Sequence, residues 1–255
     1  MPYIIGIDTG PQDRYPTDIL ADWPMFGLYL VLVASLVAVT LIDAEHYIIP
    51  PAVPYLVALV AFVVHALADD PTRPGALNLV RASRPTAGAA IAAGGAVGLA
   101  ISIFMSWRGW LPRSFPDGEP ALEVDREAQK NQPADAAEPA APLLISMTPA
   151  QVRAEIRKEI LFLLPPITLA LAWLLLTMYV RPVGQWWNQC ARTDWLSGLL
   201  GSLLGAMVGG LVIWVARIVG TMALGRVAMG LGDVDLMLGI GAVMGAGAAT
   251  VTFFL

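Results

Sequence analysis

Six long, continuously apolar stretches leave this chain few ways to fold. They lie near 25–42, 52–68, 87–107, 161–180, 196–216 and 234–255. About 20 residues of α-helix cross the roughly 30 Å hydrocarbon core of a bilayer, and these stretches reach or approach that length. Strands of a membrane barrel would instead alternate apolar and polar residues. We therefore predict an all-α fold, a polytopic membrane bundle of about six transmembrane helices.

The composition agrees with a lipid bilayer as the surroundings and excludes several other partners. Hydrophobic residues make up 57% of the chain and charged residues only 14%, against about 25% charged in soluble domains. The net charge of −5 is scattered over loops, so we expect no nucleic-acid partner. Cys190 is the single cysteine, and His46 and His65 lie on separate segments. We therefore expect no metal site and no cofactor.

The spans divide the chain into four parts. Residues 1–24 carry Asp8, Asp13, Asp18 and Asp22 against one arginine, without the basic start of a secretory signal. We expect an extramembrane arm there, the first membrane helices at 25–107, a polar loop at 108–160 and the remaining membrane helices at 161–255. The final residues, ATVTFFL, are still apolar, so we expect the chain to be truncated within its last span.

The 108–160 loop has two different halves. Its middle, DGEPALEVDREAQKNQPADAAEPAAP, is rich in proline, alanine and acidic residues, which predicts a flexible segment. Near its end, Thr148-Pro149-Ala150-Gln151 has the pattern of a capping box with proline in the first helical position. We predict a helix that begins near Thr148, continues into the fourth span and is kinked by Pro165 and Pro166.

The distribution of basic residues predicts the orientation. Loops 43–51, 108–160 and 217–233 share one side of a six-span bundle and hold nine Lys and Arg, whereas the arm and loops 66–86 and 181–195 hold six. Basic loops favour the cytoplasmic side. We therefore place the first set of loops in the cytoplasm and the amino terminus outside.

Small residues recur at four-residue spacing in the last two spans. Gly201, Gly205 and Gly209 form one such series, and Gly241 and Gly245 form another. This small-xxx-small pattern is typical of membrane helices that pack closely. We interpret these glycines as packing residues.

Two segments place an acid at a predicted membrane boundary. Asp43 ends the first span in LIDAEHYIIP, residues 41–50, and Asp233 begins the sixth in GLGDVDLM, residues 230–237. Four spans lie between the two acids, so both emerge on the same face. Ionisable residues at membrane depth are costly and often functional. The alternatives are that Asp233 only caps a helix and that Asp43 is an ordinary interfacial acid.

Together the two segments resemble the signatures of the type IV prepilin peptidases, membrane aspartic peptidases of the GxGD class. In that family one motif reads approximately Ile-Asp with a proline some seven residues later, and the other reads Gly-x-Gly-Asp-x-x-Leu. In this chain the matching positions are Asp43, Pro50, Gly230, Gly232, Asp233 and Leu236. The resemblance covers roughly 28–66 and 196–247.

The resemblance implies a function and a catalytic pair. It implies an endopeptidase in the inner membrane that removes the short basic leader of type IV prepilins or pseudopilins at the cytoplasmic face, with Asp43 and Asp233 as catalytic residues. One carboxylate of such a pair activates water while the protonated one assists at the scissile amide. Asp233 at a helix amino terminus is favoured as the anion, and Asp43 at a helix carboxyl terminus as the protonated acid.

The chain also departs from the family pattern. Bifunctional members carry paired cysteines and a methyltransferase activity; this chain lacks those pairs, so we expect no methyltransferase activity. Many members have a lysine where this chain has Asp235, which could tune the proton balance of the pair or simply be interfacial. Glu45 and His46 could orient Asp43 or lie in a solvated loop.

Three other functions remain as alternatives. A small ion or solute carrier would use the same acids, but both lie at one interface rather than at the midplane. A non-catalytic scaffold of a pilus or secretion machine is disfavoured by the intact pair of acids. An intramembrane protease of the presenilin type shares GxGD, but its first acid follows a tyrosine, whereas Ile42 precedes Asp43 here.

Overall fold

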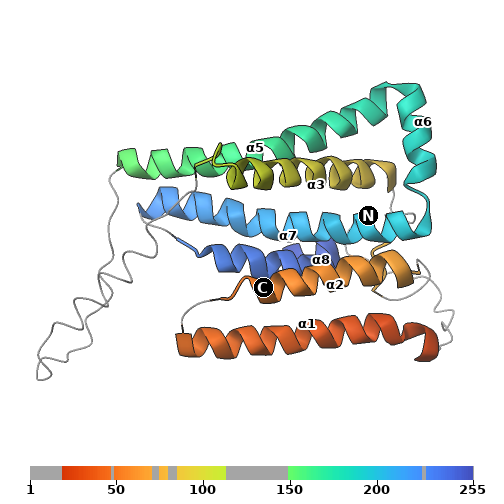
Figure 1. Cartoon of the computed structure of the whole chain (residues 1–255), viewed down its shortest axis with the longest axis horizontal. Coiled ribbons are helices and arrows are strands. Elements are labelled where there is room, and N and C mark those ends of the chain that lie inside the picture. The colour runs from red at the N-terminus through yellow and green to blue at the C-terminus, as the bar shows by residue number, and fades with distance from the viewer. Residues whose placement is uncertain are drawn as a thin grey trace, which may run out of the picture.

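The computed structural model describes residues 19–46, 49–70, 75–79, 85–112, 149–225 and 228–254. The described residues form helices joined by short connections (Figure 1). The helices are α1 (Ile19–His46), α2 (Ala52–Ala68), α3 (Pro85–Trp107), α5 (Pro149–Tyr179), α6 (Arg181–Cys190), α7 (Asp194–Leu224) and α8 (Leu231–Phe254). The prediction of an all-α membrane bundle is confirmed.

Five of the described helices are long and apolar enough to cross a membrane: α1, α3, α5, α7 and α8. The sixth predicted span, α2, has 17 residues and is a shorter apolar helix. It packs against α1, α7 and α8, which are all longer than α2. Val57, Ala58 and Ala61 of α2 are buried in the core that it forms with these helices.

The helices are arranged in layers across the molecule (Figure 1). At one edge α3 and α5 pack along each other; α7 follows, then α8 and α2, and α1 forms the opposite edge. The most extensive contact joins α7 and α8. Because the main contacts of α1 are with α2 and α8, and α1 forms an edge of the bundle (Figure 1), it is the most peripheral of the helices that carry the two acidic motifs.

The contact between α7 and α8 is made at glycines. A methyl group added at Gly205 would collide with the backbone of Gly241, and one added at Gly241 would collide with the backbone of Gly205. Gly209 lies in the same way against the backbone of Met237. The predicted close packing of the two glycine series is therefore confirmed, and it sets the position of α8 against α7.

The second half of α8 is set off by a break at Gly245. This residue has φ 82° and ψ 169° inside the helix, a conformation that is essentially restricted to glycine. The side chain of Leu77, from the segment that follows α2, lies against the break. The predicted sixth span is thus two helical pieces joined at one residue.

Two helical segments extend beyond the predicted spans. The first helix begins at Ile19 rather than at residue 25 and contains Pro24, which a helix tolerates near its start; the rest of the arm lies outside the described residues. The predicted loop 181–195 contains α6, with a proline in its first turn and Trp187 buried. The Trp187 indole donates a hydrogen bond to the Thr86 carbonyl over 3.2 Å, which fixes α6 against the start of α3.

The predicted helix before the fourth span is present. It begins at Pro149 and continues through Pro165 and Pro166 to Tyr179. Figure 1 shows that the axis of α5 changes direction part-way along its length, as two consecutive prolines predict. Thr148 and the segment 113–148, predicted to be flexible, lie outside the described residues.

Candidate active site between α1, α2 and α8

The two acidic motifs lie at the same end of the bundle. The carboxyl end of α1, the start of α2 and the start of α8 all lie there (Figure 1). Asp43 is in the last turn of α1, which ends at His46, and Asp233 is in the first turn of α8. Both acids are near the predicted helix ends but inside the helices: α1 continues to His46, and α8 begins at Leu231, so Asp233 is not the N-cap of α8.

The motifs also touch. Gly232, immediately before Asp233, packs on Ile49, which follows Asp43 and immediately precedes Pro50. A methyl group added at Gly232 would lie 2.8 Å from the Ile49 Cβ, closer than real side chains approach. The absence of a side chain at Gly232 is therefore what allows the two motifs to meet.

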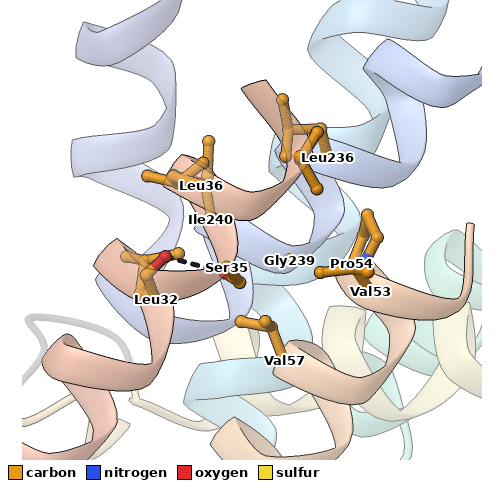
Figure 2. Close-up of a pocket in the computed structure, with 10 residues that line it drawn as sticks. Leu32, Ser35, Leu36, Val53, Pro54, Val57, Leu236, Gly239 and Ile240 are labelled. Carbon is orange, nitrogen blue, oxygen red and sulfur yellow. Dashed lines mark hydrogen bonds between the residues drawn. The ribbon is translucent and has the colours of Figure 1, made fainter. Parts of the chain in front are cut away.

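An apolar seam lies between α1, α2 and α8 (Figure 2). Side chains from three helices point into it: Leu32, Ser35, Leu36 and Val39 from α1, Val53, Pro54 and Val57 from α2, and Leu236, Gly239 and Ile240 from α8. The Ser35 hydroxyl donates to the Leu32 carbonyl over 2.7 Å. The space left is about 10 Å³, roughly enough for one water, so the seam is closed.

Both acids lie beyond the residues that line this seam, toward the ends of α1 and α8 that meet α2. Asp43 follows Val39 by four residues, and Asp233 precedes Leu236 by three, so each acid lies on the helix face that lines the seam. Asp43 is exposed and Asp233 is half-buried. Ile49, between the end of α1 and the start of α2, packs on Gly232 next to Asp233. The arrangement therefore puts two carboxylates, one exposed and one half-buried, at the end of the bundle where both motifs lie.

Local packing shapes the surroundings of Asp233. Its carboxylate folds back over the turn, so that an added methyl at Gly230 would lie 3.7 Å from the Asp233 Oδ2. The GxGD turn therefore presents its carboxylate in the first turn of α8.

The remaining residues of the two motifs have separate roles. Leu236 lines the seam, and the Pro50 carbonyl accepts a hydrogen bond from the Val53 amide over 3.3 Å at the start of α2. Asp235 accepts a hydrogen bond from the Tyr55 hydroxyl over 2.9 Å. Asp235 therefore ties α8 to α2, on a different face from Asp233, as its position two residues further along the helix predicts.

Glu45 and His46 are at the surface. Their side chains are 79% and 61% exposed, and the His46 Nδ1 lies 4.0 Å from the Glu45 Oε2. This exposure favours the solvated alternative that the sequence left open. That they orient Asp43 stays a prediction.

A buried ion pair near the site was missed by the sequence analysis. Arg217, predicted to lie in the loop 217–233, is inside α7 and almost fully buried. Its Nε lies 3.2 Å from the Oε1 of Glu159 on α5, and both side chains are at most 3% exposed. The signal was the sequence WVARIVGTMAL, in which apolar residues continue on both sides of the arginine. Moving Arg217 out of the loops leaves eight basic residues against six, so the predicted orientation is unchanged.

A second buried polar cluster lies at the other end of α2. Asp69 Oδ2 lies 3.1 Å from the His65 Nδ1 and accepts a hydrogen bond from the Leu77 amide over 3.0 Å. The His65 Nε2 is 3.4 Å from the Val243 carbonyl. These groups join the end of α2, the following segment and α8. We interpret the cluster as structural, because its hydrogen bonds tie these three segments to one another.

The described residues contain no group of three or more His, Cys, Asp or Glu side chains that could hold a metal ion. Comparisons of the chain with models of protein families, with curated proteins and with solved structures found no match. The chemistry of the site is therefore argued from its own residues.

Proposed function

We propose that the protein is a membrane-embedded aspartic endopeptidase that removes the leader peptide of type IV prepilins or pseudopilins. The substrate class comes from the resemblance of the two motifs to the prepilin peptidases. The cut is made at the cytoplasmic face of the inner membrane, by Asp43 and Asp233 acting on a water molecule.

One observation carries the proposal: the contact between Ile49 and Gly232. Residues about 180 positions apart in the sequence meet there, and the acid of each motif lies on the face that lines the same seam. The end of α1 and the starts of α2 and α8 each carry part of the two motifs. Packing alone does not explain why the motif residues gather at these three helix ends. A hydrolytic pair needs both carboxylates at one place, and an arrangement with both acids at the same end of the bundle is compatible with that requirement.

The chemistry follows from two carboxylates at one site. One is ionised and takes a proton from water, while the other is protonated and hydrogen-bonds to the scissile carbonyl or protonates the leaving amine. Like charges at close range oppose double ionisation, so the pair naturally shares one proton. In this arrangement Asp233, at the amino end of α8, is the anion, and Asp43, at the carboxyl end of α1, holds the proton.

The apolar seam suggests how substrate enters. An apolar segment of a membrane substrate is compatible with the Leu36, Val39 and Leu236 side chains that line the seam. The seam has room for about one water in the present state. Substrate therefore has to bind at its membrane-boundary end, or displace the peripheral helix α1.

Leader cleavage by the purified protein in detergent tests the proposal. Asp43→Asn and Asp233→Asn are compared with the parent and with Asp194→Asn, a control at the exposed first turn of α7, at the opposite end of the bundle. We expect either site variant to lose activity by about a thousandfold or more, while the control cuts like the parent. Thermal unfolding of each variant shows whether it is folded.

Two outcomes would contradict the proposal. A folded parent that releases no leader from either prepilins or pseudopilins would leave a scaffold or a carrier as the better explanation. Folded site variants that cut as fast as the parent would remove the two aspartates from the reaction.

A further inference from the structure

A groove lies between the start of α5 and the end of α7, at the end of the bundle that carries both acidic motifs (Figure 1). It encloses about 780 Å³, within the range of about 300–1,000 Å³ that is typical of sites for small ligands. Neither Asp43 nor Asp233 lines it. The groove is therefore separate from the candidate active site.

Two arginines one helical turn apart line this groove. Arg153 and Arg157 are on α5, and both are exposed. Within the part of the chain that the structure describes, neither forms an ion pair or a side-chain hydrogen bond, whereas the neighbouring Lys158 is bound to Glu155 over 2.6 Å. Two guanidinium groups are thus free to bind an anion, and the planar guanidinium fits phosphate oxygens in a bidentate manner.

Apolar surface continues from the arginines along α5. Ile160 and Leu164 lie three and seven residues beyond Arg157, so they share its face of the helix. Both are about half exposed, at 50% and 49%. This face of α5 is therefore charged at the end of the bundle and apolar further along, as a surface that follows the headgroup and then the acyl chains of a lipid would be.

The other wall has the same apolar character. Met222 of α7 lines the groove, and Val219 and Val215 lie three and seven residues before it on the same face. All three side chains are exposed. An acidic peptide would engage the arginines but leave these apolar stripes uncovered, whereas a phospholipid offers both a phosphate and acyl chains. The combination favours a phospholipid.

Tryptophans indicate the depth of the groove in the membrane. The Ser102 hydroxyl of α3 donates a hydrogen bond to the Phe162 carbonyl of α5 over 2.7 Å. Trp107 is five residues beyond Ser102, and Arg157 is five residues before Phe162, so in this antiparallel pair of helices they lie at the same level. Trp107 and Trp110 are 76% and 67% exposed. Exposed tryptophans of membrane helices favour the level of the lipid headgroups.

The two helices are joined immediately next to the groove. Glu159, two residues after Arg157, has its Oε1 3.2 Å from the Nε of Arg217 on α7. The next contact along is Phe162 of α5 stacked on Trp214 of α7, with ring centroids 5.2 Å apart. These contacts hold the start of α5 against α7, so the groove is formed before a ligand arrives, and less ordering is needed on binding.

We propose that this groove binds the headgroup of an anionic phospholipid, with its phosphate between Arg153 and Arg157 and its acyl chains along the apolar stripes of α5 and α7. Basic pockets between membrane helices recognise such headgroups. The proposed orientation puts the groove in the cytoplasmic leaflet, whose surface is negatively charged. The inference goes beyond the peptidase function and does not depend on it.

Lipid binding to the purified protein in neutral detergent tests this site. Native mass spectrometry follows titrations with phosphatidylglycerol and with phosphatidylcholine of the same acyl chains. Each basic residue near an anionic headgroup contributes about fivefold in affinity, so we expect the parent to bind phosphatidylglycerol about 30-fold more tightly than phosphatidylcholine. Arg153→Gln/Arg157→Gln should lose most of this preference. Because both arginines are exposed and make no ion pair among the described residues, this variant should unfold at the parent temperature.

Arg181→Gln/Arg192→Gln is the matched control. It removes the same charge from exposed residues at the opposite end of the bundle, at the start of α6 and just after its end. We expect it to keep the preference of the parent. An equal loss in the control would mean that net charge, and not the groove, selects the lipid, which overturns the proposal.

Three further outcomes would also overturn it. A parent with equal affinity for the two lipids has no anionic lipid site, and a folded Arg153→Gln/Arg157→Gln variant that keeps the preference has that site elsewhere. Glycerol 3-phosphate, which has the phosphate without acyl chains, should not compete with phosphatidylglycerol at millimolar concentration; competition would indicate a site for a soluble phosphate. Displacement of the lipid by a soluble acidic peptide would indicate a protein partner instead.

Discussion

At the scale of single residues, Gly232 decides whether the two motifs meet. An alanine there would put its methyl group 2.8 Å from the Ile49 Cβ, and Ile49 would have to move away from the start of α8. Such overpacking typically costs about 1–3 kcal/mol. We predict that Gly232→Ala keeps the bundle folded but lowers kcat/KM for leader cleavage, because it displaces the segment that links Asp43 to α2.

Gly230→Ala is the matched control for that change. Its methyl group would lie 3.7 Å from the Asp233 Oδ2, an ordinary contact that needs no rearrangement. We expect it to reduce kcat/KM less than Gly232→Ala does, in the same assay and at equal stability. Equal losses from the two alanines would mean that the separation of Ile49 from the GxGD turn does not matter.

The residues of the site were predictable to different degrees. Asp43 and Asp233 could be located from the sequence, because each follows or precedes an apolar stretch and so marks a helix end. The bond from Tyr55 to Asp235 and the contact of Ile49 with Gly232 could not, since each joins residues about 180 positions apart. Long-range contacts depend on how helices pack, and apolar periodicity in a membrane helix carries little information about which face meets which neighbour.

At the scale of elements, α8 depends on one residue in a glycine conformation. Gly245 has φ 82° and ψ 169°, and an added methyl group would also lie 2.5 Å from the Leu77 Cδ2. We predict that Gly245→Ala lowers the free energy of unfolding by about 1–3 kcal/mol. Unfolding by sodium dodecyl sulfate in mixed micelles, followed by tryptophan fluorescence, measures the change.

Gly247→Ala provides the comparison, because an added methyl group there meets nothing within 4 Å. It should leave the unfolding midpoint unchanged or raise it slightly, since alanine favours helix more than glycine does. If both alanines shift the midpoint equally, the break at Gly245 is not what limits the stability of α8.

The limits of helices were harder to predict than their existence. The five long apolar helices follow from their length, but α6 was missed, because ten residues with a mixed, tryptophan-rich sequence do not form an apolar stretch. Its helix is fixed by tertiary contacts, such as the bond from Trp187 to Thr86. The end of α7 was misplaced for a related reason: Arg217 was taken as a boundary charge, whereas its pairing with Glu159 lets the helix continue.

At the scale of the whole molecule, the proposed function requires a definite orientation. The end of α1 and the end of α6 lie at opposite ends of the bundle (Figure 1), so residues 45 and 189 should be on opposite sides of the membrane. Cys190 is the only cysteine of the chain, and Cys190→Ser gives a background without thiols. Glu45→Cys and Gln189→Cys, made separately in it, then report the two sides through a membrane-impermeant maleimide.

In right-side-out vesicles we expect the thiol at position 189 to react at once and the thiol at position 45 only after the membrane is permeabilised. Inverted vesicles should give the reverse. This orientation puts Asp43 and Asp233 on the cytoplasmic side, where the leader of a prepilin lies before export, and it agrees with the excess of basic loop residues. Reaction at position 45 and protection at position 189 in right-side-out vesicles would place the candidate site outside, where a cytoplasmic leader cannot reach it.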